Sequence, residues 1–146
     1  MYHYFSTKLK EKNANINYTN ENGDSPLIVA SHYYQLIDSI KILIENGANI
    51  NHANQNGDTA LHLAAKNGLA QIVNTLLINN AHIHFINQNG DTALTIIINN
   101  SLFYDKNIKN ILENIFYQEY EEYITNKAKV EIIKYRPEIS FNFVEK

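Results

Sequence analysis

The stretch NQNGDTALHLAAKNGLAQIVNTLLINNAHI, residues 54–83, decides the fold, and its opening NQNGDTAL returns unchanged at residues 87–94. A related NENGDSPL occupies residues 20–27. Gly57 follows Gly23 by 34 residues, and Gly90 follows Gly57 by 33. A constant period of this length predicts a chain built from repeated structural units.

Each unit is predicted to contain two short helices. Thr59 stands where its hydroxyl can cap a first helix, and Gly68 is placed to end that helix in a left-handed conformation. A second helix is expected from about Leu69 to Asn79, with a buried stripe of Ile72, Val73, Leu76 and Leu77. Asparagine at positions 79 and 80 can end it, because asparagine tolerates the left-handed region.

The preceding unit repeats this plan. Ser25 is its expected cap, and Pro26 fills the first helical position, where a missing amide hydrogen costs nothing. Its second helix carries Ile40, Leu43 and Ile44. One unit has too little apolar surface to offset its conformational entropy, so neighbouring units must stack around a shared core.

The segment from the turn glycine through the Ala-Ala pair to the Leu-Leu end resembles the ankyrin repeat, as do SPLIVA and IKILIENGANIN in the preceding unit. The resemblance covers about residues 13–116 and implies an all-α ankyrin-repeat solenoid. Its helix-turn-helix units, about 13–47, 48–80 and 81–116, would be joined by β-hairpin-like loops. Residues 1–116 would form this repeat domain, with residues 1–12 supplying a truncated first helix.

Several positions depart from the family pattern. The resemblance implies that His62 hydrogen-bonds Thr59 at the helix start, but Ile28 and Thr95 take the place of this histidine in the other units. Tyr34 stands where a glycine between the helices is usual. Asparagine replaces the family's turn aspartate in all three units, at Asn20, Asn54 and Asn87. These changes affect the expected geometry of the loops and leave the fold in place.

After Leu112 the turn motif does not restart, although apolar residues keep a helical spacing. Residues 117–146 are therefore expected to form a capping helix and tail that cover the last repeat. Tyr117, Tyr120 and Tyr123 keep a binding role open for this segment, because tyrosine is favoured at interfaces.

Nothing in the chain points to catalysis or to a cofactor. It has no cysteine, no Gly-rich phosphate loop and no Ser/His/Asp motif. His52, His82 and His84 lie at turn positions and could approach one another, but no carboxylate at matching spacing favours a metal over ordinary turn histidines. We expect a non-enzymatic protein without cofactor or metal.

Charge and hydropathy limit the class of partner. Residues 13–100 carry more acidic than basic side chains, which disfavours binding to a nucleic-acid backbone. No stretch is long and apolar enough for a membrane span. We expect a cytoplasmic chain that is monomeric when alone. Its abundant asparagine, isoleucine, lysine and tyrosine are typical of an AT-rich genome, such as that of a host-associated microbe or a virus. If the source is a host-associated microbe, the chain could be delivered into a host cell.

Asp24, Asp58 and Asp91 each follow the turn glycine and should form a row along one edge of the stack. The row could recognise a basic protein segment, or it could merely favour the helix starts through charge near each N-terminus. The resemblance implies a concave recognition surface that combines the row with neighbouring turn and first-helix residues: Thr19, Glu21, Asn22, His32, Tyr33, Gln55, Asn56, Lys66, Asn67, Ile86, Gln88, Asn89, Asn99 and Asn100.

The predicted function is a protein–protein interaction module. It could be an inhibitor or immunity-type protein that blocks a partner's active site, or an effector adaptor that docks on a host protein. Two alternatives belong to other classes: a small enzyme with its site in residues 101–146, and a structural protein that self-assembles.

Overall fold

The computed structural model describes residues 14–100 of the chain. The chain divides into two units, Met1–Ile108 and Lys109–Lys146, and every described residue belongs to the first. The expected helix in residues 1–12, the expected cap in 117–146 and the alternative of an enzyme site in 101–146 lie outside the described residues.

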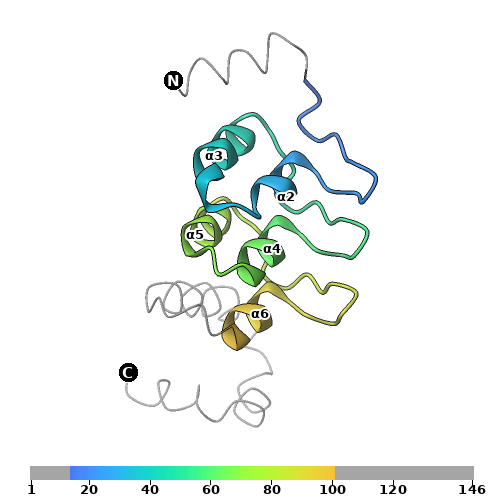
Figure 1. Ribbon diagram of the computed structural model, residues 1–146, viewed down its shortest axis with the longest axis vertical. Coiled ribbons are helices and arrows are strands. Elements are labelled where there is room, and N and C mark those ends of the chain that lie inside the picture. Colours follow the sequence, from blue (N-terminus) through green and yellow to red (C-terminus); the bar gives the residue numbers. More distant parts are fainter. Residues whose placement is uncertain (1–13, 101–146) are drawn as a thin grey trace, which may run out of the picture. The chain divides into compact units, whose positions relative to one another are not determined.

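Short helices occur in pairs within the described part of the chain. Helices α2, α4 and α6 form one layer, and α3 and α5 lie beside them in a second (Figure 1). The turns project from the side of α2, α4 and α6 (Figure 1). The bounds are α2 Pro26–Ala30, the 3-10 turn η1 Tyr34–Leu36, α3 Ile37–Glu45, α4 Ala60–Lys66, α5 Ala70–Ile78 and α6 Ala93–Asn99.

Residues 14–100 contain no extended strand. Isolated antiparallel bridges, Ala53 with Thr59 and Ile86 with Thr92, close two of the turns. The helical layers and hairpin-like turns confirm the all-α fold class expected from the repeats.

The first helix of each unit starts at the predicted cap. The Ser25 hydroxyl accepts a hydrogen bond from the Ile28 amide (3.3 Å), and Thr59 and Thr92 play the same part for α4 and α6. Pro26 occupies the start of α2. Each hydroxyl satisfies one amide that the helix itself leaves unpaired.

The helix ends also follow the predicted chemistry. Gly68, after α4, has φ = 67°, and Asn80, after α5, has φ = 66°. The first unit has Tyr34 where the glycine would stand, and there the chain forms the 3-10 turn η1 before α3 begins. A tyrosine adopts positive φ only at a cost, so the loop takes a different path.

The core lies between the two layers. Residues 60–65 of α4 are all buried, and so is the predicted stripe of α5: Ile72, Val73, Leu76 and Leu77. In α3 only Ile40 is fully buried, whereas Leu43 and Ile44 are half-buried. The middle unit is better covered because described units pack on both of its faces.

None of the helices in residues 14–100 is long and apolar enough to cross a membrane.

Candidate functional site

The three turns share one internal hydrogen-bond pattern, built by the asparagine that begins each of them. In the middle turn, Asn54 Oδ1 accepts from the amides of Asn56 and Asp58, both at 3.0 Å. The Gly57 amide donates to the Asn54 carbonyl at 2.9 Å. The turns that begin at Asn20 and Asn87 repeat these bonds. An asparagine side chain can thus satisfy amides that a tight turn leaves unpaired.

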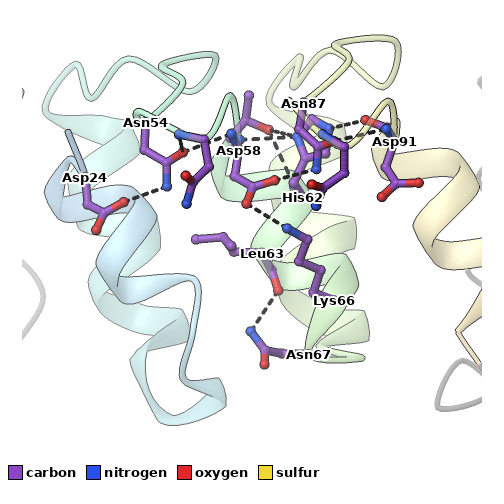
Figure 2. A network of polar contacts seen from close by, with 12 residues as sticks. Asp24, Asn54, Asp58, His62, Leu63, Lys66, Asn67, Asn87 and Asp91 are labelled. Atoms are coloured by element: carbon purple, nitrogen blue, oxygen red, sulfur yellow. Dashed lines mark hydrogen bonds and ion pairs between the residues drawn. The ribbon is translucent and has the colours of Figure 1, made fainter. Parts of the chain in front are cut away.

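The same asparagines join each turn to the one before it. Asn54 Nδ2 donates to Asp24 Oδ1 (2.8 Å), and Asn87 Nδ2 donates to Asp58 Oδ1 (2.7 Å) (Figure 2). An aspartate at either position would face another carboxylate at this distance. The asparagine amide instead donates a hydrogen bond to that carboxylate, so Asn54 and Asn87 can lie beside the aspartates that follow the preceding turn glycines.

Asp58 does not belong to an exposed acidic row, so that expectation is wrong at the middle unit. Its side chain is only 7% exposed, and its Oδ2 accepts from Lys66 Nζ at 2.6 Å (Figure 2). With Asn87 on the other oxygen, both carboxylate oxygens accept a hydrogen bond inside the protein. A buried charge needs such partners, because burial removes it from water.

The other two aspartates are half-buried. Asp24 is engaged by Asn54 and more weakly by Asn20, whose Nδ2 is 3.4 Å from Asp24 Oδ2. The Asp91 carboxylate accepts no hydrogen bond from residues 14–100. The three aspartates therefore do not form a uniform acidic edge. Asp24 is half-buried and hydrogen-bonded, Asp58 is buried, and Asp91 is half-buried with its carboxylate unpaired in residues 14–100.

Glutamines tie the turn tips together. The Gln55 amide donates to the Asn22 carbonyl (3.1 Å), and the Gln88 amide donates to the Asn56 carbonyl (2.9 Å). Gln55 Nε2 reaches the Glu21 carbonyl at 2.9 Å, and Gln88 Nε2 reaches the Gln55 carbonyl at 2.6 Å. These bonds hold adjacent tips in register, so the tips form one connected edge.

Three further residues of the predicted surface have structural partners at helix ends. Lys66 neutralises Asp58, as described above. Asn67 Nδ2 donates to the Leu63 carbonyl at 2.9 Å, within the last turn of α4 (Figure 2). Asn100 Nδ2 reaches the Ala65 and Lys66 carbonyls at 2.9 and 3.1 Å. The Asn67 and Asn100 side chains add donors at the C-terminal end of α4, where few helical amides remain to bond the last carbonyls.

The remaining predicted residues lie open to solvent or nearly so. Tyr33 is 56% exposed and Ile86 is 67% exposed, which is high for apolar side chains. The side chains of the tip residues Asn22, Asn56 and Asn89 are exposed and form no hydrogen bond within residues 14–100. Glu21, His32, Gln55, Gln88 and Asn99 are also exposed, and Thr19 is half-buried.

Sequence reasoning missed an apolar hollow on the first unit, with a volume of about 350 Å³. Tyr18, Val29, Leu36 and Leu43 are among its lining residues. Val29 is 42% exposed, whereas Leu63, at the same place in α4, is 7% exposed. Within residues 14–100, no earlier unit packs on this face, and the apolar character of Val29 alone does not distinguish it from its buried counterpart Leu63.

Two histidines within residues 14–100, His52 and His62, form hydrogen bonds to backbone groups of adjacent turns. His62 Nδ1 accepts from the Thr59 amide (3.2 Å), and its Nε2 lies 3.2 Å from the Asp91 carbonyl, as the donor in this tautomer. The predicted bond between His62 and Thr59 is confirmed. His52 Nε2 donates to the Gly23 carbonyl at 2.7 Å, and the His82 ring lies 5.3 Å from that of Phe85. Residues 14–100 contain no group of three potential metal ligands.

Comparison with known proteins agrees with this geometry. A family model described as "Ankyrin repeats (3 copies)" matches residues 4–87, more than half of the chain. The match ends where the third turn begins, and the structure continues the repeat plan through α6. No curated protein matches the chain. Ankyrin repeats are generally protein–protein interaction modules and are typically non-catalytic. With its paired helices, linked turns and this match, the chain belongs to the ankyrin repeat family.

Proposed function

We propose that this chain is a non-catalytic module that binds one protein partner through its tip surface. The tip surface comprises the exposed turn residues and the exposed C-terminal ends of α2, α4 and α6: Glu21, Asn22, His32, Tyr33, Gln55, Asn56, Asn67, Ile86, Gln88, Asn89 and Asn99. Asp24, Asp91 and Thr19 border it. Lys66 and Asn100 support it from within, and Asp58 is not part of the contact.

One observation carries the proposal. The backbones of neighbouring tips are joined by hydrogen bonds, while the side chains of Asn22, Asn56 and Asn89 remain exposed without a partner in residues 14–100. A partner that binds such a surface loses little free energy to ordering it. A rigid surface whose hydrogen-bonding side chains are still available is well suited to binding a protein partner.

The chemistry of the surface indicates the kind of partner. Its polar groups are mainly amides, which both donate and accept hydrogen bonds, and Glu21 and Asp91 supply negative charge at the two ends. Tyr33 and Ile86 offer exposed apolar anchors of the kind found at binding hot spots. We infer a protein segment that combines hydrogen-bonding groups with an apolar residue and a basic residue.

A matched pair of triple variants tests the surface. Asn22→Arg, Asn56→Arg and Asn89→Arg together enlarge the tips and add three positive charges. Gln35→Arg, Ser39→Arg and Gln71→Arg add the same charge at exposed positions of η1, α3 and α5. A partner captured by the native chain and identified by mass spectrometry is then purified and titrated against each variant.

We expect the tip variant to bind at least about tenfold more weakly, equivalent to the loss of about 1.4 kcal/mol, and the control to bind within about twofold of the native chain. Weakening by the control variant alone would place the contact on the α3 and α5 side and refute the proposed surface.

Two finer versions of this function share the same surface. As an inhibitor or immunity-type protein, the chain would abolish the activity of an enzymatic partner at equimolar amounts. As an effector adaptor, it would bind a host protein and leave that protein's activity intact. An activity assay on the purified partner separates the two.

We place the chain in a cytoplasm, its own or that of a host, as a monomer with residues 117–146 as its cap. Sedimentation over a range of concentrations tests the monomer against self-assembly.

A further inference from the structure

Every glycine of the chain follows an asparagine, which creates Asn-Gly pairs at residues 22–23, 46–47, 56–57, 67–68 and 89–90. Asparagine is a thermally labile residue. In an Asn-Gly pair the backbone nitrogen of glycine can attack the asparagine side-chain carbonyl carbon. A C–N bond forms, ammonia leaves, and water opens the resulting succinimide to aspartate or isoaspartate. Glycine permits this attack best because it has no side chain in the way.

The fold restrains all five pairs. Each glycine amide, the attacking group, donates a backbone hydrogen bond of 2.9–3.2 Å. Asn46 and Asn67 are held further, since their Nδ2 atoms donate to the Ile42 and Leu63 carbonyls at 2.7 and 2.9 Å. The reaction therefore requires local opening of a turn, and the turn that opens most easily should react first.

Among the three tips, the pair at residues 89–90 lacks the restraint that the others have. The Asn22 carbonyl accepts from Gln55, and the Asn56 carbonyl accepts from Gln88, so the next turn holds each of these Asn-Gly peptides in place. The Asn89 carbonyl accepts no such bond within residues 14–100.

Packing shows the same difference. A side-chain carbon added at Gly57 would meet Asn87 Cα at 3.0 Å, and one added at Gly23 would meet the Gln55 nitrogen at 3.1 Å. No atom of residues 14–100 lies within 4 Å of the same position at Gly90. In this part of the chain, the third Asn-Gly pair is thus uncovered on the side where the other two contact the next repeat.

We propose that Asn89 is the deamidation site of this protein, at which its fold directs conversion to aspartate and isoaspartate. The product carries a new negative charge two residues from Asp91, and isoaspartate adds one methylene to the main chain of the turn. The modification changes the exposed third tip, whereas Asn22 and Asn56 keep their side-chain amides.

The repeats provide a matched internal control. Asn56 and Asn89 lie in the same sequence, NQNGDTAL, so their intrinsic chemical reactivity is equal and only the fold distinguishes them. The full-length protein is incubated in mildly alkaline buffer, and digested samples are followed by mass spectrometry with fragmentation that identifies isoaspartate. A parallel sample is incubated unfolded in urea.

In the native protein we expect Asn89 to react about fivefold faster than Asn56. This ratio corresponds to the net stabilisation by the one backbone hydrogen bond that must break before the turn at Asn56 can open. Asn22 should also react more slowly than Asn89. In urea, Asn56 and Asn89 should react at equal rates. Equal rates at these two residues in the native protein, or faster reaction at Asn22 or Asn56, would overturn the proposal. The variant Asn89→Gln should remove the fastest reaction and leave the slower sites unchanged.

Discussion

At the scale of single residues, one amide nitrogen determines whether neighbouring turns attract or repel. Asn54 and Asn87 each use Oδ1 to build their own turn and Nδ2 to bind the aspartate of the preceding turn. An aspartate could still accept the amide bonds of its own turn, but its carboxylate would repel the aspartate of the preceding turn. The turns that begin at Asn54 and Asn87 therefore depend on asparagine, whereas Asn20 has no preceding aspartate in the sequence repeat.

Comparing Asn87→Asp with Asn20→Asp measures this second role. We expect Asn87→Asp to lower the free energy of unfolding by about 2 kcal/mol, because a second carboxylate would face the buried Asp58. Asn20→Asp should lower it by only about 0.5 kcal/mol, because the Asn20 Nδ2 contact with Asp24 is long (3.4 Å) and exposed, and the new carboxylate still accepts the two amide bonds of its turn. Urea unfolding followed by circular dichroism gives both values. Equal losses would contradict the role of Nδ2.

The buried state of Asp58 could not be predicted from the repeat alone. Asp24, Asp58 and Asp91 occupy equivalent positions in the sequence, yet only Asp58 has both a lysine eight residues later and an asparagine in the following turn. His32 and Asn99 stand where Lys66 stands in the middle unit. Burial depended on neighbours that approach only after the units have stacked.

At the scale of elements, α4 and α6 are each started by two side chains that bond one another across three residues, whereas α2 has only the Ser25 cap. In α4 the pair is Thr59 with His62, and in α6 it is Thr92 with Thr95. In both pairs the side chain at the third helical position accepts a hydrogen bond from the amide of the cap residue. His62 additionally reaches the Asp91 carbonyl of the next turn, which a threonine is too short to do.

Substitutions at His62 should separate these contributions. His62→Ala removes the reciprocal cap and the bond to the next turn and leaves a cavity, so we expect a loss of about 3 kcal/mol in unfolding free energy. His62→Thr should recover about 1 kcal/mol of that loss, because Thr95 shows that a threonine closes the same cap. Equilibrium urea unfolding provides the comparison. No recovery in His62→Thr would mean that the cap contributes little.

The turn glycines differ according to their place in the stack. Gly57 has φ = 74° and Gly90 has φ = 80°, so alanine at either position is strained by about 1 kcal/mol. Gly57→Ala would in addition push against the backbone of the third turn, and we expect a total loss of about 2–3 kcal/mol, against about 1 kcal/mol for Gly90→Ala. Thermal unfolding of the two variants tests this order, and an equal loss would disprove a tight contact between turns.

At the scale of the whole described unit, stability is distributed unevenly because each repeat depends on its neighbours. Residues 60–65 of α4 are buried, and described units pack on both faces of the middle repeat. The first unit instead exposes Val29 and the hollow beside α3. Within residues 14–100, we therefore expect local opening to be easier in the first unit than in the middle one.

Amide hydrogen exchange should show this gradient. We expect the slowest exchange in α4 and α5 and faster exchange in α3, where Leu43 and Ile44 are half-buried. Among the tips, the backbone amides of Gln55 and Gln88 should be protected, because each donates a hydrogen bond to a carbonyl of the preceding turn. Mass spectrometry or nuclear magnetic resonance of the full chain measures the rates. Uniform exchange across the helices would contradict a core centred on the middle repeat.

The sequence by itself determined the repeat, the caps, the helix ends and the buried stripe of α5. These features depend on local chemistry: Thr59 can cap the helix that follows it, and Gly68 can adopt a positive φ, without help from distant residues. The tertiary structure alone decided which polar residues remain available for binding. Asp58 became internal and Asn89 remained open because burial and hydrogen bonding across turns depend on the adjacent repeat, which lies about 33 residues away in the chain.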